Sequence, residues 1–268
     1  MIGLGLTWLV DLIRERSGVR TRRAFLAVPV IAGLVIAGSA AFTYPEVNHR
    51  GRTVVSAYVD DILRTLPPNA VLLAAGDETV LPVLHGLVVD QKRPDVRLII
   101  TPLLAADWYT DNLRHNYPDL VIEHQRYVEP EAQVVDLVSA NPDRTFYQIG
   151  GLGINNAQDL SLEGHYYFVQ EGLLNRVAPY AENITVPQVE ANLERLYAEY
   201  SVPSPEEIRS DRTSFEPRIL ANYAAPFGYL GHLYAEGGRP QEARAHFERA
   251  LQIDPHNEYA QEQLAGLP

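Results

Sequence analysis

The chain of 268 residues contains no cysteine, which excludes disulfide bonds, thiolate nucleophiles and cysteine-based metal sites. Positive charge is also scarce, because 22 Lys and Arg stand against 34 Asp and Glu, a formal net charge of -12. Such an acidic surface repels phosphate backbones, and no run of basic residues interleaved with aromatic ones follows residue 45. The composition therefore predicts that nucleic acid is not a partner.

The sequence motifs of common catalytic and cofactor sites are missing as well. None of the eight histidines has zinc-ligand spacing, and neither a G-x-S-x-G elbow nor a P-loop is present. The glycine-rich segment 150–156 follows a predicted strand but lacks a matching helix and an acidic residue for a ribose, so we interpret it as a loop. We predict no catalytic residue, no metal and no cofactor for this chain by itself.

Residues 24–42 carry no charge, and Ser39 is their only polar side chain. A helix of this length spans about 28 Å, close to the thickness of the hydrocarbon core of a bilayer. The pattern predicts one transmembrane helix at residues 24–43. Five arginines precede it, so we expect residues 1–23 in the cytoplasm and residues 45–268 outside it, as in a single-pass protein of the cell membrane.

The same region permits a second interpretation. Residues 21–26 resemble a twin-arginine export signal, and the small residues 38–41 offer a cleavage site that would release the rest of the chain. Residues 1–13 are apolar but too short to span a membrane. They form either an interfacial helix or the end of an earlier membrane helix, in which case the chain is a fragment of a longer protein.

Residues 45–180 alternate between helical periodicity and short apolar runs. Apolar runs that read as strands occupy residues 70–74, 96–100, 120–122, 145–149 and 165–170, and helical patterns occupy residues 56–66, 81–89, 105–115 and 129–139. Alternating strands and helices predict an α/β domain with a Rossmann-like, mainly parallel sheet covered on both faces.

Ligands of such a sheet bind beyond the carboxyl ends of its strands, where Asp77 and Glu78 follow the first predicted strand. Their carboxylates could accept hydrogen bonds from the hydroxyl groups of a sugar or from a peptide. The alternative interpretation is structural, with Asp77 capping the next helix.

The carboxy-terminal part is helical, with a linker at residues 181–221 and a tetratricopeptide repeat with a capping helix at residues 222–268. The repeat signature consists of Phe227, Leu230, Gly231, Tyr234, Ala243, Phe247, Ala250 and Pro255. A single repeat cannot build the long concave surface that repeat arrays use for binding. We therefore expect it to pack on the α/β domain, with binding of a partner protein as the alternative.

Several short motifs resemble one protein family. They are residues 56–59 (SAYV), 68–70 (PNA), 76–77 (GD), 93–96 (RPDV), 103–104 (LL) and 107–109 (DWY). Together they resemble the carboxy-terminal part of bacterial multi-spanning membrane proteins related to protein O-mannosyltransferases, glycosyltransferase-C-like enzymes that use lipid-linked sugars. The family's acidic catalytic loop has no counterpart in this chain.

The resemblance adds Asp95, Trp108 and Tyr109 to Asp77 and Glu78 as ligand-binding candidates, although a fold-stabilising role explains the three added residues equally well. Two functional hypotheses follow. In the first, the chain is an accessory domain of such an enzyme, recognises an acceptor protein, a glycan or a lipid-linked sugar, and is inactive alone. In the second, it is a stand-alone protein-interaction module of the cell envelope.

Overall fold

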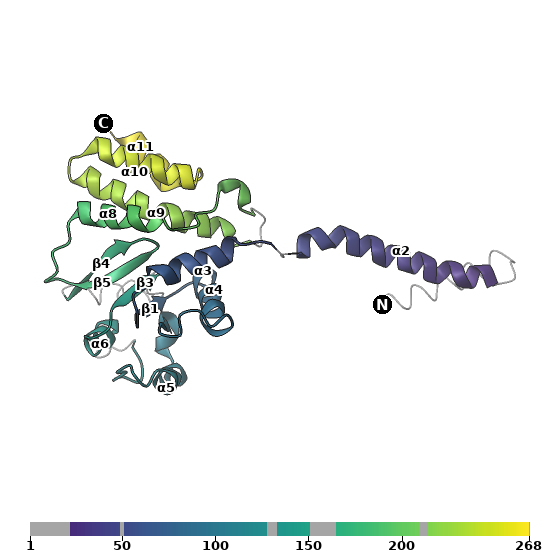
Figure 1. The fold of residues 1–268 in the computed structure, drawn as a ribbon, viewed down its shortest axis with the longest axis horizontal. Coiled ribbons are helices and arrows are strands. Elements are labelled where there is room, and N and C mark those ends of the chain that lie inside the picture. Colours follow the sequence, from purple (N-terminus) through teal and green to yellow (C-terminus); the bar gives the residue numbers. More distant parts are fainter. Residues whose placement is uncertain (1–21, 49–50, 128–132, 151–164, 210–213, 268) are drawn as a thin grey trace. The chain divides into compact units, whose positions relative to one another are not determined.

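The computed structural model describes residues 22–48, 51–127, 133–150, 165–209 and 214–267 (Figure 1). The chain divides into two units, Met1–Arg52 and Thr53–Pro268, which are treated separately below.

In the first unit, helix α2 spans Arg22–Val47. The predicted transmembrane helix at residues 24–43, and with it the single-pass membrane location, was wrong, since no helix among the described residues combines the length and the apolarity that a bilayer crossing requires. That prediction weighed the absence of charge, whereas insertion depends on the summed transfer free energy of all side chains. Small residues such as Gly33, Gly38 and Ser39 add little to that sum. Residues 1–13 lie outside the described residues.

The second unit begins with an α/β part of ten elements. In chain order they are α3 (Val54–Thr65), β1 (Val71–Ala74), α4 (Asp77–Val88), β2 (Arg97–Ile100), the 3-10 helix η1 (Thr101–Ala105), α5 (Asp107–Asn116), α6 (Val134–Ser139), β3 (Phe146–Ile149), β4 (Tyr166–Glu171) and β5 (Leu174–Pro179).

The five strands form one mixed sheet in the order β2-β1-β3-β5-β4. Strand β1 pairs in parallel with β2 and β3, whereas β5 is antiparallel to both β3 and β4. The predicted Rossmann-like arrangement was therefore wrong. Only the turn Gly172–Leu173 separates β4 from β5, and so short a connection allows only antiparallel pairing. The hairpin inserts β5 beside β3 and leaves β4 at the edge.

The strand predicted at residues 120–122 is absent, because side chains occupy the backbone groups that a strand would pair. The Val121 N–H donates to Asn141 Oδ1 over 2.8 Å, and Asn141 Nδ2 donates back to the Val121 carbonyl over 2.9 Å. The carbonyl of Ile122 accepts a hydrogen bond of 3.1 Å from Arg114 Nε.

Alternating residues of the sheet feed two hydrophobic cores. Val71 and Leu73 of β1 belong to the core covered by α5 and α6, and Leu72 and Ala74 belong to the core that includes α3, α4 and the helices after the sheet. Both faces are buried, which explains why β1 has no polar position. Figure 1 shows α8 and α9 on one side of the sheet, and α5 and α6 on the other.

The chain continues through α8 (Val186–Tyr197), the 3-10 helix η3 (Pro205–Glu207), α9 (Glu216–Glu236), α10 (Pro240–Ile253) and α11 (Glu258–Gly266). Helices α9 and α10 form the tetratricopeptide hairpin, with Gly238 at a φ of 70° in the turn. Six signature side chains are at most 3% exposed: Phe227, Leu230, Tyr234, Ala243, Phe247 and Ala250. Pro255 is exposed in the turn before α11.

Gly231 is where α9 and α10 approach most tightly, because a Cβ atom there would lie 2.6 Å from the ring of Phe247. We expect Gly231→Ala to lower the free energy of unfolding by about 2 kcal/mol, the usual cost of overpacking a core. Urea denaturation followed by circular dichroism measures this. The control is Gly266→Ala, whose Cβ would meet no atom within 4 Å. Equal stability of the two variants would contradict the close packing.

Candidate functional site

Asp77 and Glu78 occupy the first turn of α4, directly after Gly76, whose φ is 85°. The Asp77 side chain is exposed, and Glu78 Oε1 lies 3.4 Å from Arg218 Nη1 of α9. Carboxylates at this position interact favourably with the positive end of the helix dipole. Gly76, rather than Asp77, is the residue at the N-cap position.

Asp95 lies before β2, at the amino ends of the parallel strands, and is fully engaged within the fold. Its carboxylate accepts hydrogen bonds of 2.9 and 2.8 Å from Arg93 and one of 2.9 Å from the Asn69 N–H. The Arg93 guanidinium holds the pKa of Asp95 well below its usual range. These contacts join the end of α3 to the start of β2.

Trp108 and Tyr109 begin α5, beyond the carboxyl end of β2. The Tyr109 hydroxyl accepts a 2.7 Å hydrogen bond from the Ile100 N–H, and burial raises the pKa of Tyr109 to about 12. Trp108 is 57% exposed and packs edge-on against Tyr109. Four of the five candidates thus follow the carboxyl ends of β1 and β2, whereas Asp95 lies at the opposite end of the sheet.

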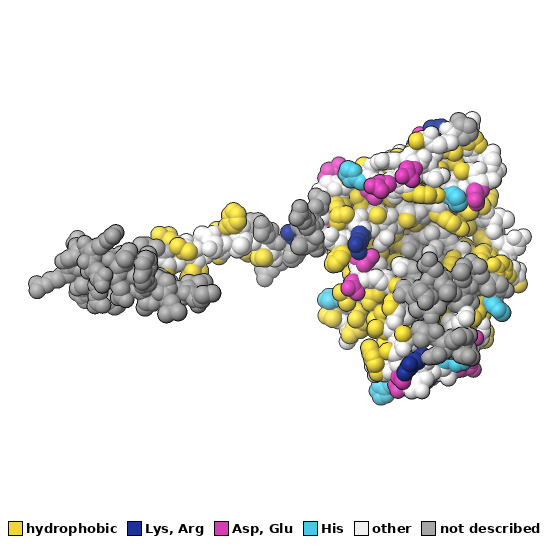
Figure 2. Space-filling model, turned by 180° about the vertical axis from the view of Figure 1, so that it is seen from behind, with side chains coloured by type: hydrophobic (Ala, Val, Ile, Leu, Met, Phe, Trp, Pro, Cys, Tyr) yellow, Lys and Arg dark blue, Asp and Glu magenta, His cyan; other side chains and the backbone are white. Residues whose placement is uncertain are grey.

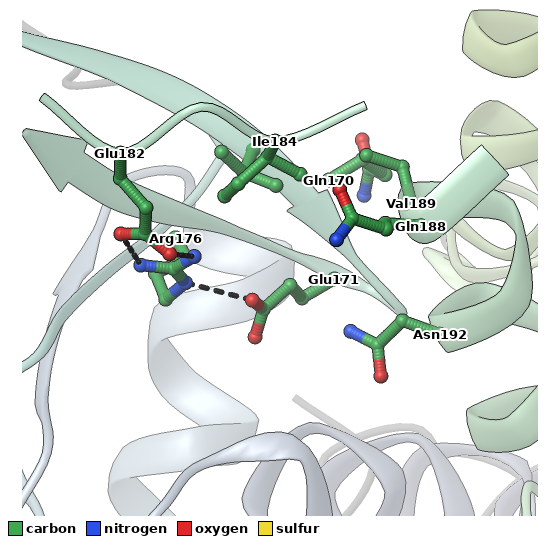
Figure 3. A pocket seen from close by; sticks show the side chains of 9 residues that line it. Gln170, Glu171, Arg176, Glu182, Ile184, Gln188, Val189 and Asn192 are labelled. Carbon is green, nitrogen blue, oxygen red and sulfur yellow. Dashed lines mark hydrogen bonds and ion pairs between the residues drawn. The ribbon is translucent and has the colours of Figure 1, made fainter. Parts of the chain in front are cut away.

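A different group of polar side chains surrounds a hollow of about 200 Å³ between the β4–β5 hairpin and α8, which we call the hairpin hollow (Figure 3). Its lining consists of Val169, Gln170, Glu171, Arg176, Glu182, Ile184, Gln188, Val189 and Asn192.

Arg176 of β5 organises the charged side of the hairpin hollow. Its Nε donates to Glu171 Oε1 over 2.7 Å, and its two Nη atoms donate to both oxygens of Glu182 over 2.9 and 2.7 Å. Tyr147 of β3 donates a further 2.9 Å hydrogen bond to Glu171 Oε2. The two carboxylates raise the pKa of Arg176, and Arg176 lowers the pKa of Glu182. Bidentate pairing fixes this side of the hollow rigidly.

The opposite side carries open amide groups from α8. Gln188 Oε1 accepts a 2.8 Å hydrogen bond from the Thr185 N–H, and Asn192 Oδ1 accepts one of 2.7 Å from Arg195. Gln188 Nε2 and Asn192 Nδ2 form no hydrogen bond within the described residues. Figure 3 shows both nitrogens pointing toward the side of the hollow that holds Glu171. Two donors, fixed in direction by their own oxygens, therefore remain free for a ligand.

Sequence reasoning missed the hairpin hollow because its residues come from a predicted outer strand and a predicted linker. The signal that could have found it is local: Glu171 and Arg176 flank a Gly172–Leu173 turn, so hairpin pairing brings their opposite charges together. Glu182, Gln188 and Asn192 carry no comparable signal, because their approach to β5 depends on how α8 packs.

Comparison with known families places two parts of the chain. Residues 55–137 match the family model described as TMEM260-associated domain 2, and residues 224–257 match the tetratricopeptide repeat. TMEM260 is an O-mannosyltransferase-related protein, so the suspected relation to that class of enzyme is confirmed to this extent. No curated protein and no solved structure matches the chain.

The first match runs from α3 into α6 and the second covers the hairpin of α9 and α10. The two matches support an accessory or protein-interaction role related to an O-mannosyltransferase. The hairpin hollow lies between the two matched segments in the sequence.

Proposed function

We propose that this chain is a non-catalytic accessory module of an O-mannosyltransferase-related enzyme and that it recognises an acceptor glycan in the hairpin hollow. The observation that carries the proposal is the pair of free amide donors, Gln188 Nε2 and Asn192 Nδ2, facing a fixed carboxylate above apolar Val169 and Val189. A few oriented polar groups over an apolar floor are typical of small-ligand sites. The hydroxyl groups of a sugar both donate and accept hydrogen bonds, so they complement both sides.

The volume of the hollow limits the ligand. Sites for drug-sized molecules have roughly 300 to 1,000 Å³, and the hairpin hollow has about 200 Å³. One sugar ring, rather than a longer glycan, fits this space, and the remainder of an acceptor would extend into solvent.

The electrostatics favour binding over catalysis. Glu171 and Glu182 are both paired with Arg176, and the lowered pKa of Glu182 makes it a poor general base near neutral pH. Neither carboxylate is therefore available to take a proton from an acceptor hydroxyl. The transfer reaction would belong to another part of the enzyme.

The test is titration of the full chain with mannose, a mannosylated Ser/Thr peptide and the same peptide without sugar, followed by calorimetry or NMR. We expect weak binding of the two sugar-bearing ligands alone. Replacing Gln188 and Asn192 together with alanine should weaken it at least tenfold, since each lost hydrogen bond is worth about 1 kcal/mol.

The matched control is Gln261→Ala on α11, an amide that bonds the Pro255 carbonyl and lies away from the hollow. This variant should bind as the unmodified chain does. Binding of the peptide regardless of its sugar, or equal binding by the double alanine variant, would contradict the proposal.

A second candidate function is binding of a protein partner at the repeat, which the tetratricopeptide match suggests. The specific observation is a hollow of about 330 Å³ lined by Glu190, Glu194, Glu242, Ala245, His246 and Arg249. Part of this lining is committed to the fold, because His246 Nε2 lies 3.0 Å from Glu190 Oε1 and joins α10 to α8. Replacing Glu194 with Gln would affect a protein ligand at this place and leave sugar binding unchanged.

A further inference from the structure

Helix α4 is apolar on two opposite faces. Val80 and Val83 are buried against the rest of the second unit, whereas Leu81, Leu84 and Val88 on the outer face are 57%, 38% and 64% exposed. Figure 2, seen from behind, shows hydrophobic side chains gathered on the side of this unit that carries α4. A helix that is apolar all round is normally buried on all sides. The outer face of α4 is therefore a surface prepared for contact.

The spacing of this face specifies what can cover it. Asp77, Leu81, Leu84 and Val88 follow one another at intervals of four, three and four residues. On a helix of about 3.6 residues per turn, these positions form one line, which we call the α4 seam. Intervals of three and four are those at which two helices interlock their side chains as in a coiled coil. The α4 seam thus fits the apolar stripe of a second helix.

The charges along the α4 seam specify the rim of that partner. Four carboxylates stand against two cations, Lys92 and Arg218, for a net charge of -2; the carboxylates are those of Asp60, Asp77, Glu78 and Asp90. Lys92 is already paired with Asp60 over 2.7 Å. A second copy of the chain would bring two acidic rims together, which disfavours self-association. A helix flanked by Lys or Arg would be attracted.

We infer that the α4 seam docks a basic amphipathic helix of a partner protein, with aliphatic residues at intervals of three and four and Lys or Arg beside them. This inference is independent of the proposed sugar site, since the two surfaces share no residue. The seam lies within residues 55–137, the segment that matches TMEM260-associated domain 2.

The probe is a fluorescein-labelled synthetic peptide of three heptads, with Leu at the a and d positions and Lys at the e and g positions. Its binding to the full chain is measured by fluorescence anisotropy. We expect Leu81→Gln combined with Val88→Gln to weaken binding at least tenfold. The same peptide with Glu in place of Lys should also bind at least tenfold more weakly than the Lys peptide.

Val121→Gln is the control, because Val121 is 49% exposed and lies outside α4. It should leave the anisotropy titration unchanged. Circular dichroism checks that the Gln variants fold; if the double variant unfolds, each single substitution is measured instead. Unchanged binding by the folded seam variants would overturn the inference. So would a seam-dependent dimer in sedimentation velocity, which would assign the surface to a second copy.

Discussion

Replacing Arg93 with alanine is expected to lower the free energy of unfolding by about 3 kcal/mol, the cost of breaking a partly buried hydrogen-bonded ion pair. Arg93 Nη1 donates to the carbonyls of Leu63 and Leu66 over 2.6 and 2.8 Å, and Nη2 donates to the Pro67 carbonyl over 2.9 Å. The same guanidinium holds Asp95. One side chain therefore satisfies the carbonyls at the end of α3 and positions the start of β2.

Two further substitutions separate this role from a general effect of charge. Arg93→Lys keeps the charge but cannot reach three carbonyls and a carboxylate at once, so it should lose most of the same stability. Arg218→Ala removes an exposed arginine and should change stability by less than about 0.5 kcal/mol. Chemical denaturation of all three variants provides the comparison. A loss as small for Arg93→Ala as for Arg218→Ala would refute the assigned role.

The pH dependence of this pair has a defined sign. Because Arg93 lowers the pKa of Asp95 in the folded chain, the ionised carboxylate stabilises the fold at pH values above about 4, its unfolded value. That contribution disappears as the pH falls through the lowered folded pKa. In Arg93→Ala it should be missing at neutral pH already, so the stability difference between the two chains should narrow in acid.

Asp61→Ala should have an effect of similar size, about 3 kcal/mol. Asp61 of α3 is fully buried, and its Oδ2 accepts hydrogen bonds of 2.7 Å from the Tyr223 hydroxyl and 2.8 Å from the Ser201 N–H. Its Oδ1 has no hydrogen-bond partner among the described residues. Alanine would leave the hydroxyl and the amide unpaired in the interior. Thermal and urea unfolding measure the loss.

Asp61→Asn tests the charge separately from the hydrogen bonds. Burial raises the pKa of Asp61, so the ionised form is the disfavoured one in the folded chain. Asn retains an acceptor without the charge, and at neutral pH this variant should be at least as stable as the unmodified chain. Its advantage should shrink as the pH falls toward the unfolded value near 4, because protonation then removes the charge from Asp61 too. A large loss of stability in Asp61→Asn at neutral pH would show that the charge itself is required.

The sequence carried much of this fold where periodicity and burial coincide. The apolar run at residues 70–74 corresponds to β1, and the helical spacing at residues 56–66 corresponds to α3. The tetratricopeptide hairpin could be predicted from single positions, because Gly231 and Phe247 have a packing role that few other residue types can fill.

Other features depend on contacts that no local pattern encodes. The segment at residues 120–122 has the apolarity of a strand, yet its backbone pairs with the Asn141 side chain, which is distant in sequence. Strand direction was likewise not readable from apolar runs, and a two-residue turn reversed it between β4 and β5. The hairpin hollow requires the packing of α8 on that hairpin, so its residues could not be gathered from spacing alone.

Helix α3 has a consequence for how the second unit can be divided. Its Asp61 is bound by Ser201 and Tyr223, which lie beyond the sheet in the sequence, and its Tyr58 accepts a 2.8 Å hydrogen bond from Asn222. The segment matching one family thus has its core completed by the helix that leads into the other. In evolutionary terms, the two matched segments are not freely exchangeable modules. A gene rearrangement that separated them would leave a buried carboxylate without its donors, so they are constrained to be inherited together.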